Sequence, residues 1–307
     1  MIKNNIDNDE DKDILPVIIA GGFGIRLQQY LKFKIPKQFI KLLLNGNSLF
    51  QQTIQRVSAI FPNAKILILA NYKHKDIVKR QLAEIDCQNY ILILEQYCNN
   101  TFLSSLFACK FATKNNYKKI FIFPSDHFID TDKQFTKSIK SHLKLLKSKN
   151  KHILFGIIPT DANTQYGYIG LNMDINVKNN IFDVMNFVEK PPMEMAIKLL
   201  NNGNYLWNSG IFLIDVDIYL NEIKKYQQSS YEVYKNIHFN VIDKNGTYII
   251  KNIANDSMKI SMDKAIIEKS KHLLCVKCCN FQWYDIGSAE NFYKLIKANK
   301  ISIQHLH

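Results

Sequence analysis

Five short apolar runs, separated by stretches of helical character, constrain the fold of this chain more than any other feature. Each run is rich in isoleucine and lacks polar–apolar alternation, which indicates strands that are covered on both faces. The runs are LPVIIA at 15–20, AKILILA at 64–70, YILIL at 90–94, KKIFIF at 118–123 and HILFGII at 152–158. Strand and helix alternating in this way predict an α/β fold with a Rossmann-like, doubly wound and mostly parallel sheet.

The segments between these runs carry apolar residues at helical spacing. SLFQQTIQRVSAI begins with Ser48, which we expect to be a helix N-cap. KDIVKRQLAEI, FLSSLFACKFATK and QFTKSIKSHLKLLKSK fill the later gaps. After GYIGLNMDI the pattern changes to hairpin-like material, IFDVMNFVEKPP, which predicts a region inserted in or appended to the same core.

The formal net charge of +13 points to anionic partners such as nucleotides, nucleic acid or lipid headgroups. Much of the excess is lysine scattered among asparagine and isoleucine, as in KNNYKK, which is typical of a solvated surface. The sequence has no basic motif interleaved with aromatic residues, so nucleic acid is not predicted as a partner. No apolar run is long enough to cross a bilayer, so no membrane association is predicted either.

Six cysteines in 307 residues show no framework spacing, which favours reduced thiols and a cytoplasmic protein. Cys275 and Cys278 form a CxxC pair, but a zinc site would need a second pair or nearby histidines. Only His272 lies close in sequence, so zinc or redox chemistry is not favoured there. The polar and acidic residues 1–13 are predicted to form a disordered leader.

The first apolar run ends directly in a glycine-rich turn, GGFGIR, at residues 21–26. Ligands bind at the carboxyl ends of strands in open α/β sheets, and successive glycine amides there can surround a phosphate. Arg26 and Lys37 would supply positive charge beside it. The spacing excludes a Walker A loop and the dinucleotide fingerprint. The glycines alone fit a bare tight turn equally well, but Gly-Gly-x-Gly-x-Arg followed by Pro36-Lys37-Gln38-Phe39 is far more specific.

This pattern and seven later ones occur in the order in which they stand in the sugar-phosphate nucleotidyltransferases. The later segments are EQYCNNTFLSS, FIFPSDHFI, FGIIPTDANTQYGYIG, FVEKPP, YLWNSGIFLI, SMDKAIIEKS and WYDIGS. Over residues 14–290 the chain therefore resembles this family, and within it most closely the bacterial mannose-1-phosphate guanylyltransferases. The resemblance implies the mixed sheet of the nucleotidyltransferase (GT-A-like) type.

The resemblance also implies an enzyme that joins GTP and mannose 1-phosphate into GDP-mannose and releases pyrophosphate. Such chemistry depends on in-line positioning and on stabilising charge at the transferred phosphorus. Arg26 would bind the departing pyrophosphate, and Lys37 would lie between the two reacting phosphates. The triphosphate would be held by three glycine amides, those of Gly21, Gly22 and Gly24. The matched positions for the base are Asn100 and Thr101, with Glu95 nearby as an acceptor for guanine N–H groups.

A divalent cation, Mg²⁺, is implied as the cofactor because the reacting phosphates crowd negative charge together. Asp126 follows an apolar run and so emerges at the carboxyl edge of the sheet, and Asp285 is the second metal-binding carboxylate by resemblance. Without the family motifs, an aspartate at a strand end would more often be a turn former or an N-cap. His127 is assigned no catalytic role.

For the sugar phosphate, the resemblance points to Gly167 between two tyrosines, to Glu189 and Lys190, and to Asn208. A carboxylate can accept hydrogen bonds from two sugar hydroxyls, and a lysine can pair with the phosphate. Without the resemblance, the Gly167 segment fits a hairpin turn equally well, and Glu189 and Lys190 fit a surface ion pair. SMDKAIIEKS is expected to form a helix that supports the site.

Several positions depart from the family pattern. Phe23 and Ile25 replace small hydroxyl residues in the glycine turn, and Gln96, Cys98 and Asn99 replace a proline, a glycine and an arginine near the base. Losing a buried cation beside the nucleotide would weaken binding by about 1.5–3 kcal/mol. The departures leave open relaxed base choice or slow turnover.

We therefore expect a nucleotidyltransferase domain over residues 14–295 and a short tail over 296–307, without a carboxyl-terminal isomerase module. The alternatives are a transferase for another sugar 1-phosphate or base, and a weakly active paralogue that binds nucleotide sugars as a regulatory subunit. A homo-oligomer is left open.

Overall fold

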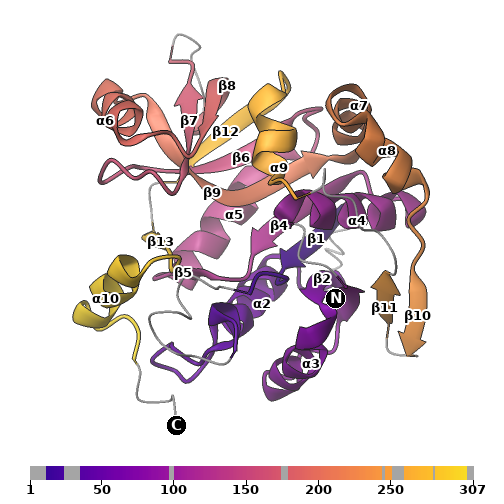
Figure 1. The fold of residues 1–307 in the computed structure, drawn as a ribbon. Coiled ribbons are helices and arrows are strands. Elements are labelled where there is room, and N and C mark those ends of the chain that lie inside the picture. The colour runs from indigo at the N-terminus through magenta and orange to yellow at the C-terminus, as the bar shows by residue number, and fades with distance from the viewer. Residues whose placement is uncertain are drawn as a thin grey trace, which may run out of the picture.

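A computed structural model describes residues 12–23, 35–96, 100–173, 179–243, 246–250, 259–278 and 281–302. In these ranges a mixed sheet of eleven strands runs through the molecule with helices on both sides (Figure 1). The strand order is β10-β11-β3-β2-β1-β4-β9-β6-β12-β8-β7.

The first half of the chain supplies the strands β1 (Ile14–Ile19), β2 (Ile66–Asn71), β3 (Tyr90–Glu95), β4 (Lys119–Pro124) and β6 (His152–Ile157). β1 to β4 form a parallel block, whereas β6 lies beyond β9 and pairs in parallel with β12. β1 is paired in parallel with β2 and β4, and β2 with β3. All five strands predicted from the apolar runs are therefore confirmed, and so is the mixed α/β sheet.

The second half pairs mostly in antiparallel fashion. Its strands are β7 (Gly167–Leu171), β8 (Ile181–Glu189), β9 (Tyr205–Asp215), β10 (Asn240–Asp243), β11 (Thr247–Ile250) and β12 (Leu273–Cys278). The predicted hairpin segment is β8, which pairs with β7. The long strand β9 pairs with β4, β6 and β7, so β9, β6, β12, β8 and β7 form a closed circuit of pairings.

The helices cover the two faces of the sheet as separate layers. One apolar cluster joins α2 (Leu49–Ile60), α3 (Lys75–Glu84), α5 (Asp132–Leu146) and α6 (Met193–Asn202) to one face. The other joins α4 (Asn100–Lys114), α7 (Val216–Tyr226), α8 (Gln228–Lys235) and α9 (Met262–Ala265) to the opposite face. Alternate residues of β1 enter the two clusters, which explains why its sequence is apolar without alternation. Within the described ranges, no helix is long and apolar enough to span a lipid bilayer.

The start of α2 shows how local sequence fixes an element. Ser48 accepts a hydrogen bond from the backbone N–H of Gln51 at 3.1 Å, and the backbone N–H of Ser48 donates to Gln51 Oε1 at 3.0 Å. This reciprocal pair is a capping box, which satisfies two amides at a helix start. The predicted N-cap is confirmed.

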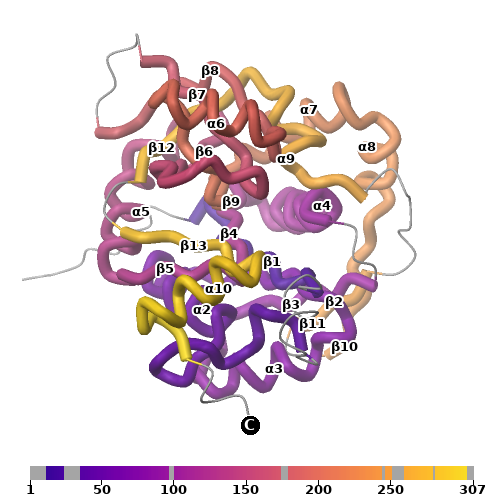
Figure 2. The backbone as a smooth tube through the Cα atoms, turned by 60° about the vertical axis from the view of Figure 1, so that its left-hand side comes forward, coloured from indigo at the N-terminus to yellow at the C-terminus, as the bar shows by residue number. Residues whose placement is uncertain are grey.

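A third apolar cluster lies outside the main sheet and joins residues from the two ends of the chain. It packs α10 (Ala289–Lys297) against the segment after the 3₁₀ helix η2 (Lys37–Phe39), and Leu43 forms a β-bridge with Ile301. Beside it, β13 (Trp283–Asp285) pairs with β5 (His127–Ile129) in a small two-stranded sheet. Figure 2 shows α10 next to β5 and α2. Two further 3₁₀ helices are η3 (Tyr72–His74) and η5 (Ile267–Lys269).

Candidate active site

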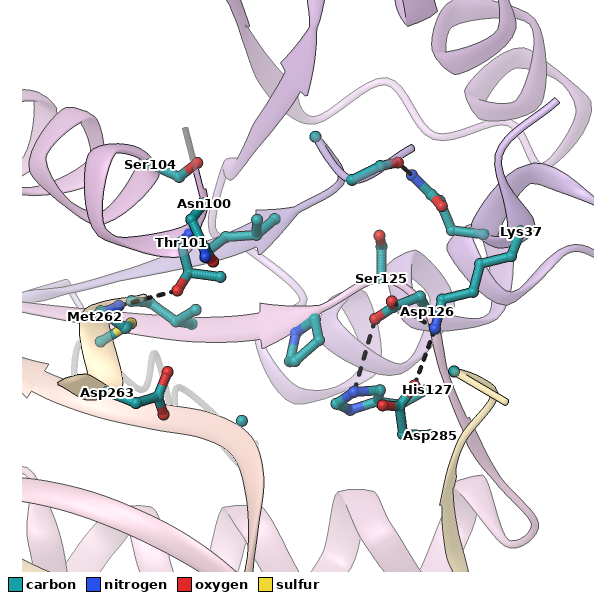
Figure 3. Close-up of a pocket in the computed structure, with 18 of the residues that line it drawn as sticks. Lys37, Asn100, Thr101, Ser104, Ser125, Asp126, His127, Met262, Asp263 and Asp285 are labelled. Atoms are coloured by element: carbon teal, nitrogen blue, oxygen red, sulfur yellow. Dashed lines mark hydrogen bonds and ion pairs between the residues drawn. The ribbon is translucent and has the colours of Figure 1, made fainter. Parts of the chain in front are cut away.

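A cavity of about 660 Å³ opens at the carboxyl ends of β1 and β4 and extends to α9. Figure 3 shows two groups of side chains facing each other across it, with Lys37, Asp126 and Asp285 on one side and Asn100, Thr101 and Asp263 on the other. Nine of the fourteen residues predicted from the sequence line this cavity. They are Gly21, Gly22, Lys37, Glu95, Asn100, Thr101, Asp126, Lys190 and Asp285.

Lys37 bridges the two aspartates that were predicted as metal ligands. Its Nζ lies 2.9 Å from Asp126 Oδ2 and 2.9 Å from Asp285 Oδ1, and it donates to the backbone oxygen of Ile286 at 3.0 Å. Burial by itself lowers the pKa of Lys37, but the charges of Asp126 and Asp285 outweigh it and hold the pKa above the ordinary value. Burial likewise raises the pKa of Asp126, and the opposing charge of Lys37 brings it down to about 2. The ammonium and the Asp126 carboxylate are therefore both charged at neutral pH.

Local structure explains how residues so far apart in sequence meet. Pro36 precedes η2 in extended conformation and the helix buries Lys37. β13 pairs with β5 so that Asp285 stands opposite His127, the neighbour of Asp126. The third apolar cluster then holds both segments against the same wall.

The two carboxylates are chemically suited to Mg²⁺. The described residues contain no cluster of three or more His, Cys, Asp or Glu side chains that could enclose a metal. However, Mg²⁺ is usually held by one or two carboxylates, with phosphate oxygens and water completing its shell. Asp126 and Asp285 already hold a cation between them, at the edge of a cavity large enough for such ligands. The donor set therefore fits the implied ion.

Arg56 and Trp283 both donate hydrogen bonds to His127, the neighbour of Asp126 at the cavity wall. Trp283 Nε1 donates to its Nδ1 at 3.2 Å, and Arg56 Nη2 donates to its backbone oxygen at 3.3 Å. Burial lowers the pKa of His127, so its imidazole is neutral at neutral pH. These contacts give it a packing role beside Asp126.

The described part of the glycine turn is held by side chains beneath it. Gln38 Nε2 donates to the backbone oxygens of Ala20 at 3.2 Å and Gly22 at 2.7 Å. Phe23, a departure from the family pattern, packs edge-on against His74, with ring centroids 4.9 Å apart. Phe23 thus provides a ring contact with His74 where the family pattern has a small hydroxyl residue.

Glu95 lies at the buried end of the cavity beside Gly21. A Cβ on Gly21 would overlap the Glu95 carboxylate, so any larger residue there would force that side chain to move. Glu95 is 4% exposed and accepts a hydrogen bond from Ser104 Oγ at 3.2 Å. Burial raises its pKa to about 7, and the bond from Ser104 only partly offsets that effect. A ligand N–H group that donated a hydrogen bond to this carboxyl would stabilise its charged form.

Lys190 reaches the cavity through a strained backbone. Its φ is 50°, in the left-handed region, although it is not glycine and precedes a proline. Its Nζ pairs with Glu189 Oε1 at 2.8 Å. Gly167 stands opposite Glu189 in the β7–β8 pairing, and a Cβ there would clash with the Glu189 carboxylate. Backbone strain of about 1–3 kcal/mol is common where function requires a fixed side-chain position.

Asp263 lines the cavity, although the sequence predicted only that its helix supports the site. It accepts a hydrogen bond from Asn208 Nδ2 at 2.8 Å. Burial and the charge of Glu189 raise its pKa to about 7. In sequence it follows the N-cap Ser261, where an acidic residue is adequately explained by the helix dipole. The neighbouring sequence did not distinguish a residue of the helix start from a residue that lines the cavity.

The remaining predicted residues fall into two groups. Glu189 and Asn208 do not line the cavity themselves but contact Lys190 and Asp263, which do. Gly167 lies one step further away, beside Glu189. Gly24 and Arg26 lie outside the described residues, as do the departures Ile25, Cys98 and Asn99.

The chain is similar to several proteins that carry a name. The chain is 32% identical over 300 residues to mannose-1-phosphate guanylyltransferase 2 of Escherichia coli O157:H7, covering 94% of this chain and 61% of that protein. It is 31% identical over 293 residues to mannose-1-phosphate guanylyltransferase of Escherichia coli, covering 92% and 62%. The chain thus spans about three fifths of the length of these relatives.

The fold is also that of a crystal structure described as mannose-1-phosphate geranyltransferase from Thermus thermophilus. The two superimpose with a TM-score of 0.72 at 22% identity, over 90% of this chain and 76% of that one. The model of the nucleotidyl transferase family matches residues 15–300, a range that includes every residue lining the cavity. The resemblance seen in the sequence is confirmed, and the chain belongs to the nucleotidyl transferase family.

Proposed function

We propose that this protein transfers a guanylyl group from GTP to mannose 1-phosphate, giving GDP-mannose and pyrophosphate. The observation that carries the proposal is the arrangement of Lys37 between Asp126 and Asp285 at the cavity wall, near the glycine turn that ends β1. The relatives named as mannose-1-phosphate guanylyltransferases supply the choice of base and sugar.

In this reaction an oxygen of the sugar 1-phosphate attacks the α-phosphorus of GTP. A new P–O bond forms while the bond from the α-phosphorus to the bridging oxygen breaks, and the electron pair leaves with pyrophosphate. The attacking oxygen is ionised at neutral pH, so no general base is required. The protein's task is to align the reactants and to stabilise negative charge at the transferred group.

The residues divide this task by their positions. Lys37, which is charged and buried, would lie against the reacting phosphates, and the amides of Gly21 and Gly22 would face the triphosphate. Asp126 and Asp285 would hold Mg²⁺, which supplies further neutralisation of phosphate charge when bound. By family resemblance, Gly24 would complete the glycine cradle and Arg26 would bind the leaving pyrophosphate.

The two substrates would lie at opposite ends of the cavity. Glu95, Asn100 and Thr101 surround the end assigned to the guanine nucleotide. The far end is bounded by Lys190, which would pair with the phosphate of the sugar. The other residues assigned to the sugar are Gly167, Glu189 and Asn208.

The test is pyrophosphate release from a panel of nucleoside triphosphates and sugar 1-phosphates in the presence of Mg²⁺. We expect GTP with mannose 1-phosphate to give the highest kcat/KM. Asp126→Asn should lower kcat by at least about 100-fold, since it removes one of the two carboxylates that would hold Mg²⁺. Glu232→Gln, on the exposed face of α8, is the matched control and should keep the wild-type rate.

Each other outcome identifies an alternative. A different preferred pair would make the protein a nucleotidyltransferase for another base or sugar. Binding of nucleotide sugars without pyrophosphate release would support the regulatory paralogue. Full activity in Asp126→Asn would refute the assigned site.

A further inference from the structure

Asp263 lines the cavity between Thr101, assigned to the nucleotide, and Asn208, assigned to the sugar. It belongs to the first turn of α9, whose Met262 backbone N–H donates to Thr101 Oγ1 at 3.0 Å. On its other side, Asn208 Nδ2 donates to Asp263 Oδ1 at 2.8 Å. Figure 3 shows the Asp263 carboxyl directed into the cavity, across from Lys37 and Asp126. Its position is therefore fixed by one contact to the nucleotide end and one to the sugar end.

Part of the hydrogen-bonding capacity of this carboxyl is unused by the protein. A carboxylate has two oxygens with about four lone-pair positions. Within the described part of the chain, it accepts from Asn208 Nδ2 and from its own backbone N–H. The nearby ammonium of Lys190 is already paired with Glu189. A half-buried carboxyl with few donors beside another carboxylate is costly, and donors from a ligand would offset that cost.

We propose that Asp263 accepts a hydrogen bond from a hydroxyl of the bound substrate. The ligand chemistry is that of a polyol, which both the sugar 1-phosphate and the ribose of the nucleotide offer. The observations favour the sugar, because Asn208 fixes the Asp263 carboxyl and the Glu189–Lys190 pair lies near it. The assignment of the two ends rests on the proposed function. Asp263 thereby becomes a specificity-determining residue rather than a support of the helix.

The test combines Asp263→Asn with substrates that lack single hydroxyls. Asparagine is isosteric with aspartate and can keep its contact with Asn208 after rotation of the amide. Its NH₂ group removes one acceptor that the hydroxyl would use. The ligands are mannose 1-phosphate, its 2-, 3- and 4-deoxy analogues, GTP, and the 2′- and 3′-deoxy forms of GTP. Binding to the 307-residue chain is measured by calorimetry, and KM by pyrophosphate release.

We expect Asp263→Asn to weaken mannose 1-phosphate binding about 10- to 100-fold, the effect of one hydrogen bond to a charged acceptor. One deoxy sugar should bind as weakly to wild type as mannose 1-phosphate binds to the variant. The same deoxy sugar should bind wild type and variant within about twofold of each other, because the interaction is already absent. The affinity for GTP and the melting temperature should stay at wild-type values. Glu232→Gln is the control and should change none of these quantities.

The same experiment separates the two sources of hydroxyls. If Asp263→Asn weakens GTP instead, and a deoxy GTP shows the coupling, the hydroxyl belongs to the ribose and the role of Asp263 stands. If neither ligand loses more than about twofold in affinity, the carboxyl is structural and the proposal is overturned. Should Asp263→Asn fail to fold, Asp263→Ser is compared in the same way. Calorimetry remains decisive if wild type releases no pyrophosphate, which would refute the proposed function alone.

Discussion

Replacing Lys37 with methionine tests the central electrostatic arrangement of the site. The substitution keeps the length and the apolar stem but removes the charge that both Asp126 and Asp285 contact at 2.9 Å. Losing one partner of a buried ion pair costs about 3–5 kcal/mol. The aspartate side chains are 32% and 24% exposed, and solvent screening reduces the expected loss to about 2–3 kcal/mol. The melting temperature should then fall by about 5 °C.

The same change should raise the affinity for divalent ions. In wild type, a metal must share the two carboxylates with the ammonium of Lys37, whereas in Lys37→Met they carry uncompensated charge. We expect Mn²⁺ to bind the variant about tenfold more tightly or better, because one repulsive charge has been removed. Added Mg²⁺ should also restore more of the melting temperature in the variant than it adds to wild type.

The assay is thermal unfolding with and without Mg²⁺, together with Mn²⁺ binding followed by electron paramagnetic resonance. Lys41→Met is the matched control, because Lys41 is 43% exposed and pairs with Glu84 at the surface. It should shift stability by less than about 1 kcal/mol and leave metal affinity unchanged. Wild-type stability in metal-free Lys37→Met, with unchanged Mn²⁺ affinity, would refute the reasoning.

Three further predictions concern stability. Gly21→Ala should lower the free energy of unfolding in urea by about 1–3 kcal/mol, because its methyl group overlaps a buried carboxylate; Gly22→Ala, which meets no atom within 4 Å, should lose less than half as much. Because the folded-state pKa of Asp126 is depressed to about 2, its contribution of about 1–2 kcal/mol is present above pH 4 and lost as pH falls toward 2. Urea titrations from pH 2 to 5 should show that difference between wild type and Asp126→Asn, and parallel curves would contradict it. Glu222→Ala should cost about 3 kcal/mol in the same measurement, since it leaves the fully buried His152 without its acceptor at 3.1 Å; a loss below 1 kcal/mol would show that water replaces the carboxylate.

The parallel half of the sheet could be predicted from sequence because each strand is covered on both faces. Burial on two faces leaves an uninterrupted apolar run, and β1 and β2 show it directly. The sequence pattern of the antiparallel strands predicts their positions less clearly. β8 is mostly half-buried or exposed, so it lacks an uninterrupted apolar run. β9 pairs with three other strands, and the spacing of its apolar residues does not predict which strands these are.

The site divides along similar lines. The glycine turn and Asp126 could be placed because they directly follow buried strands, whose carboxyl ends share one edge. Lys37 and Asp285 are 248 residues apart, and only family resemblance could bring them together in advance. The role of Asp263 could not be predicted because it depends on Asn208, which reaches helix α9 from strand β9.

The closed circuit of strands β9, β6, β12, β8 and β7 has a consequence for association between chains. Every strand of that circuit has neighbours on both sides, so in the described part of the large sheet only β10 has a single partner. Unpaired sheet edges are where chains add strands to one another and grow into fibrils. Here the exposed edge is four residues long and is interrupted by a bulge between Val241 and Asp243. A strand of another chain could therefore pair with only a short, irregular edge of the large sheet, even though Val241 in that edge is 70% exposed.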